Sequence, residues 1–145
     1  MTIEVTNTSG QLIPADQVTS LMTFALGALD LNTSCDLNVS FIKDDYMSEL
    51  HMKWMDEPGT TDVLSFPMDM PLSSQDIVTL GDIVISPAVA QSQAMAQGHS
   101  ADHEIFILAT HGLLHILGYD HAEKEEEKAM FALQEKIVHD WEKSS

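Results

Sequence analysis

The chain has 145 residues, of which 44% are hydrophobic, 20% charged and 6% aromatic, and these values predict one globular domain over residues 1–145. Its 23 acidic residues face six lysines and no arginine, a formal net charge of −17, which argues against a general nucleic-acid binder that neutralises phosphates with basic side chains. Cys35 is the single cysteine, residues 1–4 lack signal-peptide features and no apolar run approaches the roughly 18–20 residues of a membrane helix, so we expect a reduced, cytoplasmic protein.

The first half of the chain alternates strand and helix patterns. Residues 2–6 alternate apolar and polar side chains and predict a strand, which the turn-like residues 7–10 end. Pro14 suits the first turn of a helix, and apolar residues recur at helical spacing until Asn32. The next predicted elements are a strand over 37–42 and a short helix over about 44–55, ended by Pro58 and Gly59.

The second half continues the alternation. A strand is predicted over 61–66, ended by Pro67, followed by a polar surface loop over 69–75 and a strand over 81–85. A helix is then predicted from the N-cap Ser86 and Pro87 to Gly98. The next helix covers 101–117, is capped by Ser100 and is ended by Gly118, and a last helix runs from 123 to about 141. Together these elements predict an α/β (α+β) fold in which a small mixed four-stranded sheet packs with about five helices.

Three histidines near the end of the helix over 101–117 predict a metal site. His111, His115 and His121 follow the pattern H-x3-H-x5-H. Residues four apart lie on one face of a helix, so His111 and His115 can bind one ion. A continuing helix would carry His121 roughly 240° away from that pair, at about 100° per residue. The helix must therefore end between them, and Gly118 is the residue that can adopt the left-handed turn.

Three neutral imidazoles with an open fourth position are typical of a catalytic zinc site, and such an ion acidifies water and polarises a phosphoryl or carbonyl oxygen. Nickel, copper or iron would also suit three histidines. The alternative is that the three are hydrogen-bonded core histidines. The remaining histidines are interpreted as surface or local-structure residues; these are His51, His99, His103 and His139.

The same segment matches the metalloprotease pattern H-E-x-x-H-x-x-G-x-x-H except at its second position, which is Gly112. The missing glutamate is the general base of peptide hydrolysis, so Gly112 argues against a protease. A mid-helix glycine also costs about 1 kcal/mol relative to alanine. We expect a compensating reason, such as close approach of substrate to the metal.

Residues 111–121, which read HGLLHILGYDH, resemble the signature of the YbeY family of bacterial metal-dependent endoribonucleases. Residues 62–67 and 80–86 resemble two strands of that family, and chain length and element order agree with it. The resemblance implies cleavage of single-stranded RNA, notably in maturing the 3′ end of small-subunit rRNA and in ribosome quality control. It also implies that His111, His115 and His121 are the metal ligands.

Other site residues follow less directly. The family has a functional arginine before the segment that resembles 58–62, and Lys53 is the best match here. Lysine offers a point charge without the bidentate fork of arginine, and it could instead be a solvated surface residue. Asp120 could orient a ligand or move a proton, or it could cap the turn after Gly118. Asp62 and Ser65 could line the cleft or bond to neighbouring backbone.

The charge of −17 makes long-range attraction of RNA unfavourable, so binding must depend on local features. The candidates are the metal, Lys53 and helix N-termini. We hypothesise that ribosomal particles or ribosome-associated proteins deliver the rRNA. The alternatives are a zinc hydrolase with another substrate, including a peptidase, and a noncatalytic ribosome-assembly factor with a structural metal.

Overall fold

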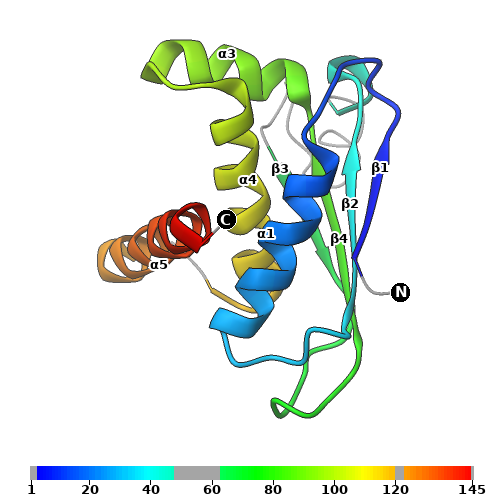
Figure 1. The fold of residues 1–145 in the computed structure, drawn as a ribbon, viewed down its shortest axis with the longest axis vertical. Coiled ribbons are helices and arrows are strands. Elements are labelled where there is room, and N and C mark those ends of the chain that lie inside the picture. Colours follow the sequence, from blue (N-terminus) through cyan, green and yellow to red (C-terminus); the bar gives the residue numbers. More distant parts are fainter. Residues whose placement is uncertain (1–2, 48–62, 120–122, 145) are drawn as a thin grey trace.

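A computed structural model describes residues 3–47, 63–119 and 123–144. The chain forms a four-stranded sheet whose strand order is β1-β2-β4-β3 (Figure 1). The strands are β1 (Ile3–Asn7), β2 (Asp36–Phe41), β3 (Val63–Pro67) and β4 (Thr79–Ile85). β1, β2 and β4 run parallel, and β3 pairs antiparallel with β4. The predicted mixed four-stranded sheet is therefore confirmed, with the β3 edge strand supplying the antiparallel pairing.

The helices lie mainly on one side of this sheet (Figure 1). They are α1 (Ala15–Ala28), α3 (Pro87–Gln97), α4 (Ala101–Ile116) and α5 (Lys124–Ser144), and residues 44–47 are also helical. α1 packs on β1, α4 packs on β3 and β4, and α5 packs on both α1 and α4. The sheet, the α1–α4 pair and α5 thus form three successive layers, with α4 in the middle one.

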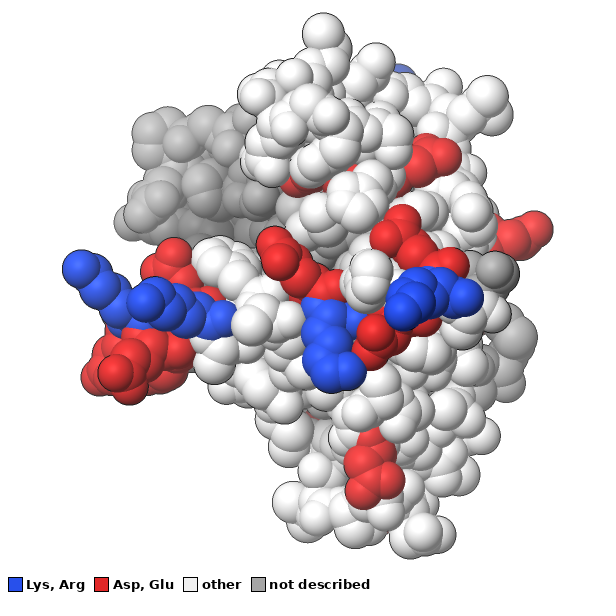
Figure 2. Space-filling view, turned by 60° about the vertical axis from the view of Figure 1, so that its left-hand side comes forward, with Lys and Arg blue, Asp and Glu red and all other residues white. Residues whose placement is uncertain are grey.

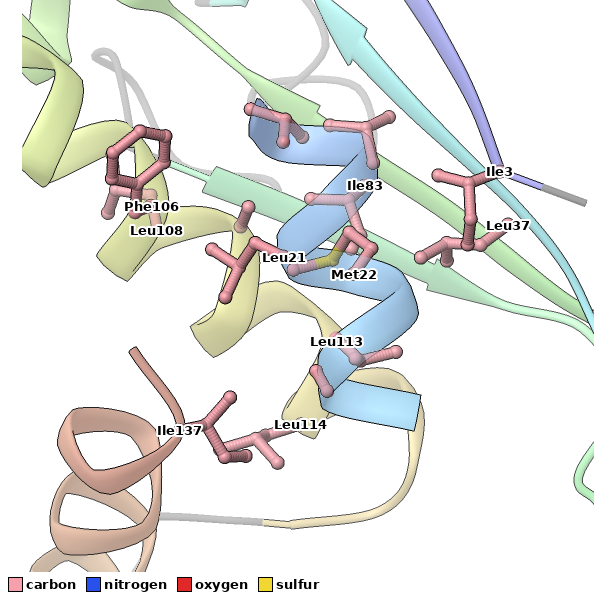
Figure 3. Packing of buried hydrophobic residues seen from close by; sticks show 14 of the residues in the cluster. Ile3, Leu21, Met22, Leu37, Ile83, Phe106, Leu108, Leu113, Leu114 and Ile137 are labelled. Atoms are coloured by element: carbon pink, nitrogen blue, oxygen red, sulfur yellow. The ribbon is translucent and has the colours of Figure 1, made fainter. Parts of the chain in front are cut away.

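The core fills the space between the sheet and the α1–α4 layer and continues to α5, where Ile137 lies beside Leu114 (Figure 3). One side-chain row crosses the sheet through Val5, Val39, Ile83 and Ser65, which are register partners on adjacent strands. Val39 and Ile83 are fully buried. Ile83 and Ser65 of this row lie against α4 at Gly112, so the position of the helix that carries two of the predicted ligands is fixed by the interior of the protein.

Helix ends follow the predicted capping residues. Ser86 Oγ accepts a hydrogen bond from Val89 N at 3.3 Å, and Ser100 Oγ accepts one from His103 N at 3.1 Å. Gly98 ends α3 in the left-handed conformation, with φ 79°. Local sequence signals therefore define the sharp turn from α3 into α4.

Some expectations differ in detail or fall outside the described residues. Residues 69–75 form an exposed loop as predicted, but Met70 and Leu72 are among its exposed side chains, at 51% and 91%. The structure describes residues 44–47 of the short helix predicted over 44–55, and the rest of that helix lies outside the described residues. In the part of the chain that the structure describes, no helix is both long and apolar enough to cross a membrane.

Candidate metal centre

Two of the predicted metal ligands lie together near the C-terminal end of α4. The imidazole rings of His111 and His115 have their centroids 4.8 Å apart and meet edge to face at 68°. Both residues are half-buried. The partial negative charge of a helix C-terminus favours a cation there. The pair is therefore placed where its nitrogens and the helix end can act on the same positive ion.

The end of α4 has the geometry that the sequence predicts. Gly118 has φ 95°, its N–H donates to His115 O at 3.1 Å, and Tyr119 N donates to Leu114 O at 3.0 Å. This pair of bonds is a Schellman motif, which closes a helix and redirects the chain. The break between His115 and His121 is therefore confirmed on the side of Gly118 that the structure describes.

Lys53, Asp62, Asp120 and His121 lie outside the described residues. Among the residues that are described, no three His, Cys, Asp or Glu side chains come together as a possible metal site. The described part of α4 thus supplies two imidazoles of the predicted set, and their donor chemistry fits zinc or a related divalent metal.

Gly112 has a structural reason that differs from the expected one. A Cβ atom built on Gly112 would lie 2.7 Å from Ile83 Cγ2 and 3.2 Å from Val63 Cγ2. The missing side chain therefore allows the sheet to pack closely against α4. This contact explains the glycine without the expected approach of substrate to the metal. A glutamate here would point its side chain into β3 and β4, so the protease base has no room at this position.

Ser65 stabilises the same contact between β3 and α4. Its hydroxyl donates to Gly112 O at 3.1 Å. Of the two roles considered for Ser65, bonding to neighbouring backbone is the one that this contact supports. The β3 strand is thus held against α4 one residue after His111.

His111 also contacts α5, through two residues that the sequence analysis did not single out. His111 Nδ1 lies 2.8 Å from Gln134 Oε1. The ring of Phe131 stacks on the ring of His111 with a centroid distance of 5.9 Å. A polar amide within a buried stripe was the signal that could have drawn attention to Gln134. These contacts fix His111 from the side opposite the sheet.

A groove of about 650 Å³ lies along this side of the molecule, with lining residues from α3, α4 and α5. His111, Glu104, Phe131 and Gln134 are among those residues. Glu104 is buried and pairs with the His99 ring through Oε1 and Nε2. One wall of the groove is thus the face of α4 that carries Glu104 and His111.

His139 is exposed, as predicted. The other two described histidines outside the predicted ligand set, His99 and His103, have local partners. His99 pairs with Glu104, and His103 Nδ1 lies 3.5 Å from Glu142 Oε2. His103 precedes His111 by about 12 Å along the helix axis at 1.5 Å per residue. These histidines therefore belong to the junction of α3, α4 and α5 and not to the predicted ligand set.

Comparison with known proteins identifies relatives of this chain. The family model described as Endoribonuclease YbeY matches residues 4–142. A protein named Endoribonuclease YbeY from Nocardia farcinica is 46% identical, over 99% of this chain and 82% of that protein. Its namesake from Mycobacterium tuberculosis is 45% identical, over 97% of this chain and 84% of that protein.

A solved structure supports the fold independently. The solution structure of a Thermotoga maritima protein superposes with a TM-score of 0.65 and covers 96% of this chain and 88% of that one. Sequence identity between the two is 24%. The layered arrangement around the mixed sheet is therefore shared with a distant solved protein.

Proposed function

The chain belongs to the Endoribonuclease YbeY family and is an endoribonuclease, and we propose that it uses a metal ion to cut single-stranded RNA. We further propose that its substrate is rRNA and that it acts in small-subunit rRNA 3′-end maturation and ribosome quality control. The match over residues 4–142 supports a single catalytic domain over residues 1–145. Such a substrate would place the protein in the cytoplasm.

The observation that carries the metal proposal is the arrangement of His111 and His115 at a helix end that turns back at Gly118. In this proposal His111, His115 and His121 hold one Zn²⁺, with nickel or another divalent metal as the alternative. When bound, the metal would supply Lewis acidity toward a phosphoryl oxygen and lower the pKa of water. Gln134 on α5 contacts the His111 ring, and Ser65 on β3 donates a hydrogen bond to the adjacent Gly112.

Two further residues complete the proposed site. Lys53 would bind a phosphate of the RNA as a point charge. Asp120, adjacent to His121 in sequence, would orient a ligand or carry a proton to the leaving oxygen. Both assignments rest on sequence position, because both residues lie outside the described residues.

Single-strand specificity has a direct test. Zinc-loaded protein is incubated with a single-stranded RNA, with the same sequence annealed into a duplex, and with the equivalent single-stranded DNA. We expect cleavage of the single-stranded RNA alone. Equal cleavage of the duplex would contradict the proposed specificity. Cleavage of peptides or esters with RNA left intact would favour the alternative of a zinc hydrolase with another substrate.

The role of ribosomal particles has a separate test. Because the net charge is −17, free RNA gains little from long-range attraction, and a particle would bring the scissile strand to the site. We expect faster cleavage of rRNA within small-subunit particles than of the same RNA free in solution. Equal rates would contradict delivery by the particle.

A further inference from the structure

We propose that Gln134 on α5 is a positioning residue of the metal centre, whose side-chain oxygen sets the tautomer of His111. In this arrangement His111 carries its proton on Nδ1 and presents Nε2 as the metal-binding nitrogen. The inference rests on the proposed function, because it assumes that His111 is a metal ligand. It adds a residue from a third element to a site otherwise assigned to α4 and the chain that follows it.

The contact itself defines the proton position. His111 Nδ1 and Gln134 Oε1 are 2.8 Å apart, within the range of a hydrogen bond. An amide oxygen can only accept, so Nδ1 must donate. A neutral imidazole has one N–H, and a proton on Nδ1 leaves the lone pair on Nε2. Gln134 therefore selects the nitrogen with which His111 can bind a cation.

Gln134 is held in place by its surroundings. Its residue exposure is 6%, and it lies on the buried face of α5 together with Met130 and Trp141. Trp141 Nε1 donates to Ser20 Oγ on α1 at 3.0 Å, which fixes α5 against the layer below. The packing of α5 therefore fixes the backbone from which the Gln134 amide reaches His111.

The His111 ring is constrained by its neighbours as well as by Gln134. His115 meets it edge to face at 4.8 Å, and Phe131, one turn before Gln134, stacks on it at an interplanar angle of 26°. Ring stacking restricts rotation, and the amide distinguishes the two ring nitrogens. When a metal-ligating histidine loses the hydrogen-bond partner of its other ring nitrogen, the metal affinity of the site typically falls about 10–100-fold.

The first test needs no metal. Nitrogen-15 NMR of the imidazole rings reports which nitrogen of His111 carries the proton in metal-free protein. We expect the Nδ1–H form in the unmodified protein and in Gln134→Glu, which keeps an acceptor oxygen. Gln134→Met, which removes the acceptor at similar volume, should shift His111 toward the Nε2–H form. An unprotonated Nδ1 in the unmodified protein would overturn the proposal.

The second test measures zinc affinity by competition with a chelator, with folding checked by circular dichroism. Gln134→Met should weaken zinc binding about 10–100-fold, whereas Gln134→Glu should stay within about threefold. Ala132→Gln, an exposed neighbour on α5, is the matched control and should bind as the unmodified protein does. Unchanged affinity in Gln134→Met would overturn the positioning role.

His115→Ala separates this inference from the function on which it rests. If His115→Ala loses zinc affinity but folded Gln134→Met does not, the metal site stands and Gln134 is structural. If neither substitution changes zinc affinity, the metal site itself is misassigned. If Gln134→Met and Gln134→Glu lose affinity equally, buried packing rather than the acceptor oxygen matters, and the proposal fails.

Discussion

Gly112 separates two functions that one sequence pattern could serve. The spacing of the histidines is shared with zinc proteases, yet the position of their catalytic glutamate faces Ile83 and Val63 on the sheet. A side chain at residue 112 would therefore pack against the sheet and could not activate water. The absence of a glutamate was visible in the sequence, but its physical cause depends on which way that side of α4 faces.

We expect Gly112→Ala to destabilise the protein by up to about 2 kcal/mol, because overpacking a core costs typically about 1–3 kcal/mol, which the helix-propensity gain of about 1 kcal/mol offsets only in part. The added Cβ would lie 2.7 Å from Ile83 Cγ2, and Ile83 is fully buried. Urea denaturation measures the change in the free energy of unfolding.

Gly27 on α1 is the matched control. A Cβ there would meet its nearest atom, Thr33 Cγ2, at 4.0 Å, and the residue is exposed. Gly27→Ala should therefore raise the free energy of unfolding by about 0.5–1 kcal/mol. If both alanine variants were equally stabilised, the contact between α4 and the sheet would not be as close as the structure places it.

Lys53 allows a prediction from chemistry alone. If its ammonium contacts a phosphate, Lys53→Met should raise the KM for RNA about tenfold, since a hydrogen bond to a charged group contributes about 1.5–3 kcal/mol. Lys53→Arg should lower the KM, because guanidinium can bind phosphate with two hydrogen bonds. Lys43→Met removes the same charge at an exposed position; a KM change as large as that of Lys53→Met would indicate a general charge effect.

The individual elements were largely predictable because their signals are local. Ser86, Ser100, Gly98 and Gly118 marked helix ends in the sequence, and each does so in the structure. Strand order was not predictable in this way, because pairing β2 with β4 and placing β3 at the edge depend on contacts between distant segments. The contact between α5 and His111 was missed for the same reason.

The end of α4 is the element on which the site depends. Gly118 has φ 95°, and a Cβ there would meet Met70 Cε at 3.7 Å, an ordinary contact. The cost of Gly118→Ala is therefore conformational, about 1–2 kcal/mol for a left-handed residue other than glycine. We also expect weaker zinc binding, because a changed turn would misdirect the chain toward His121; equilibrium unfolding and chelator competition measure the two effects.

Gly98 at the end of α3 controls for the backbone effect. It has φ 79° and nothing within 4 Å of an added Cβ. Gly98→Ala should therefore lose similar stability while keeping zinc affinity. Equal losses of zinc affinity in the two variants would contradict a specific role for the turn at Gly118.

At the scale of the whole molecule, the described residues on the side that carries α5 form no purely basic surface for RNA. Figure 2 shows lysine and acidic side chains next to one another across this face. Lys136 Nζ lies 2.8 Å from Asp140 Oδ2 and lowers the pKa of that exposed carboxyl through their hydrogen bond. Acidic neighbours thus dilute the lysines of α5 on this face.

The charge of −17 predicts an unusual salt response. A basic protein with 6–10 phosphate contacts loses about 10³–10⁵ in affinity between about 50 and 200 mM salt. Here added salt screens repulsion as well as attraction, so we expect the affinity for free RNA to fall less than about tenfold over that range. Fluorescence anisotropy with a labelled RNA measures it, and a steep loss would reveal a concentrated basic site.

The measurement that tests the account most directly is cleavage of a single-stranded RNA by zinc-loaded protein beside His115→Ala, prepared identically and confirmed folded by circular dichroism. The account predicts that the unmodified protein cuts the RNA, that a chelator stops it and that His115→Ala, with reduced zinc content, does not cut. Undiminished cleavage by the folded variant would place the RNA-cutting centre elsewhere than at the end of α4.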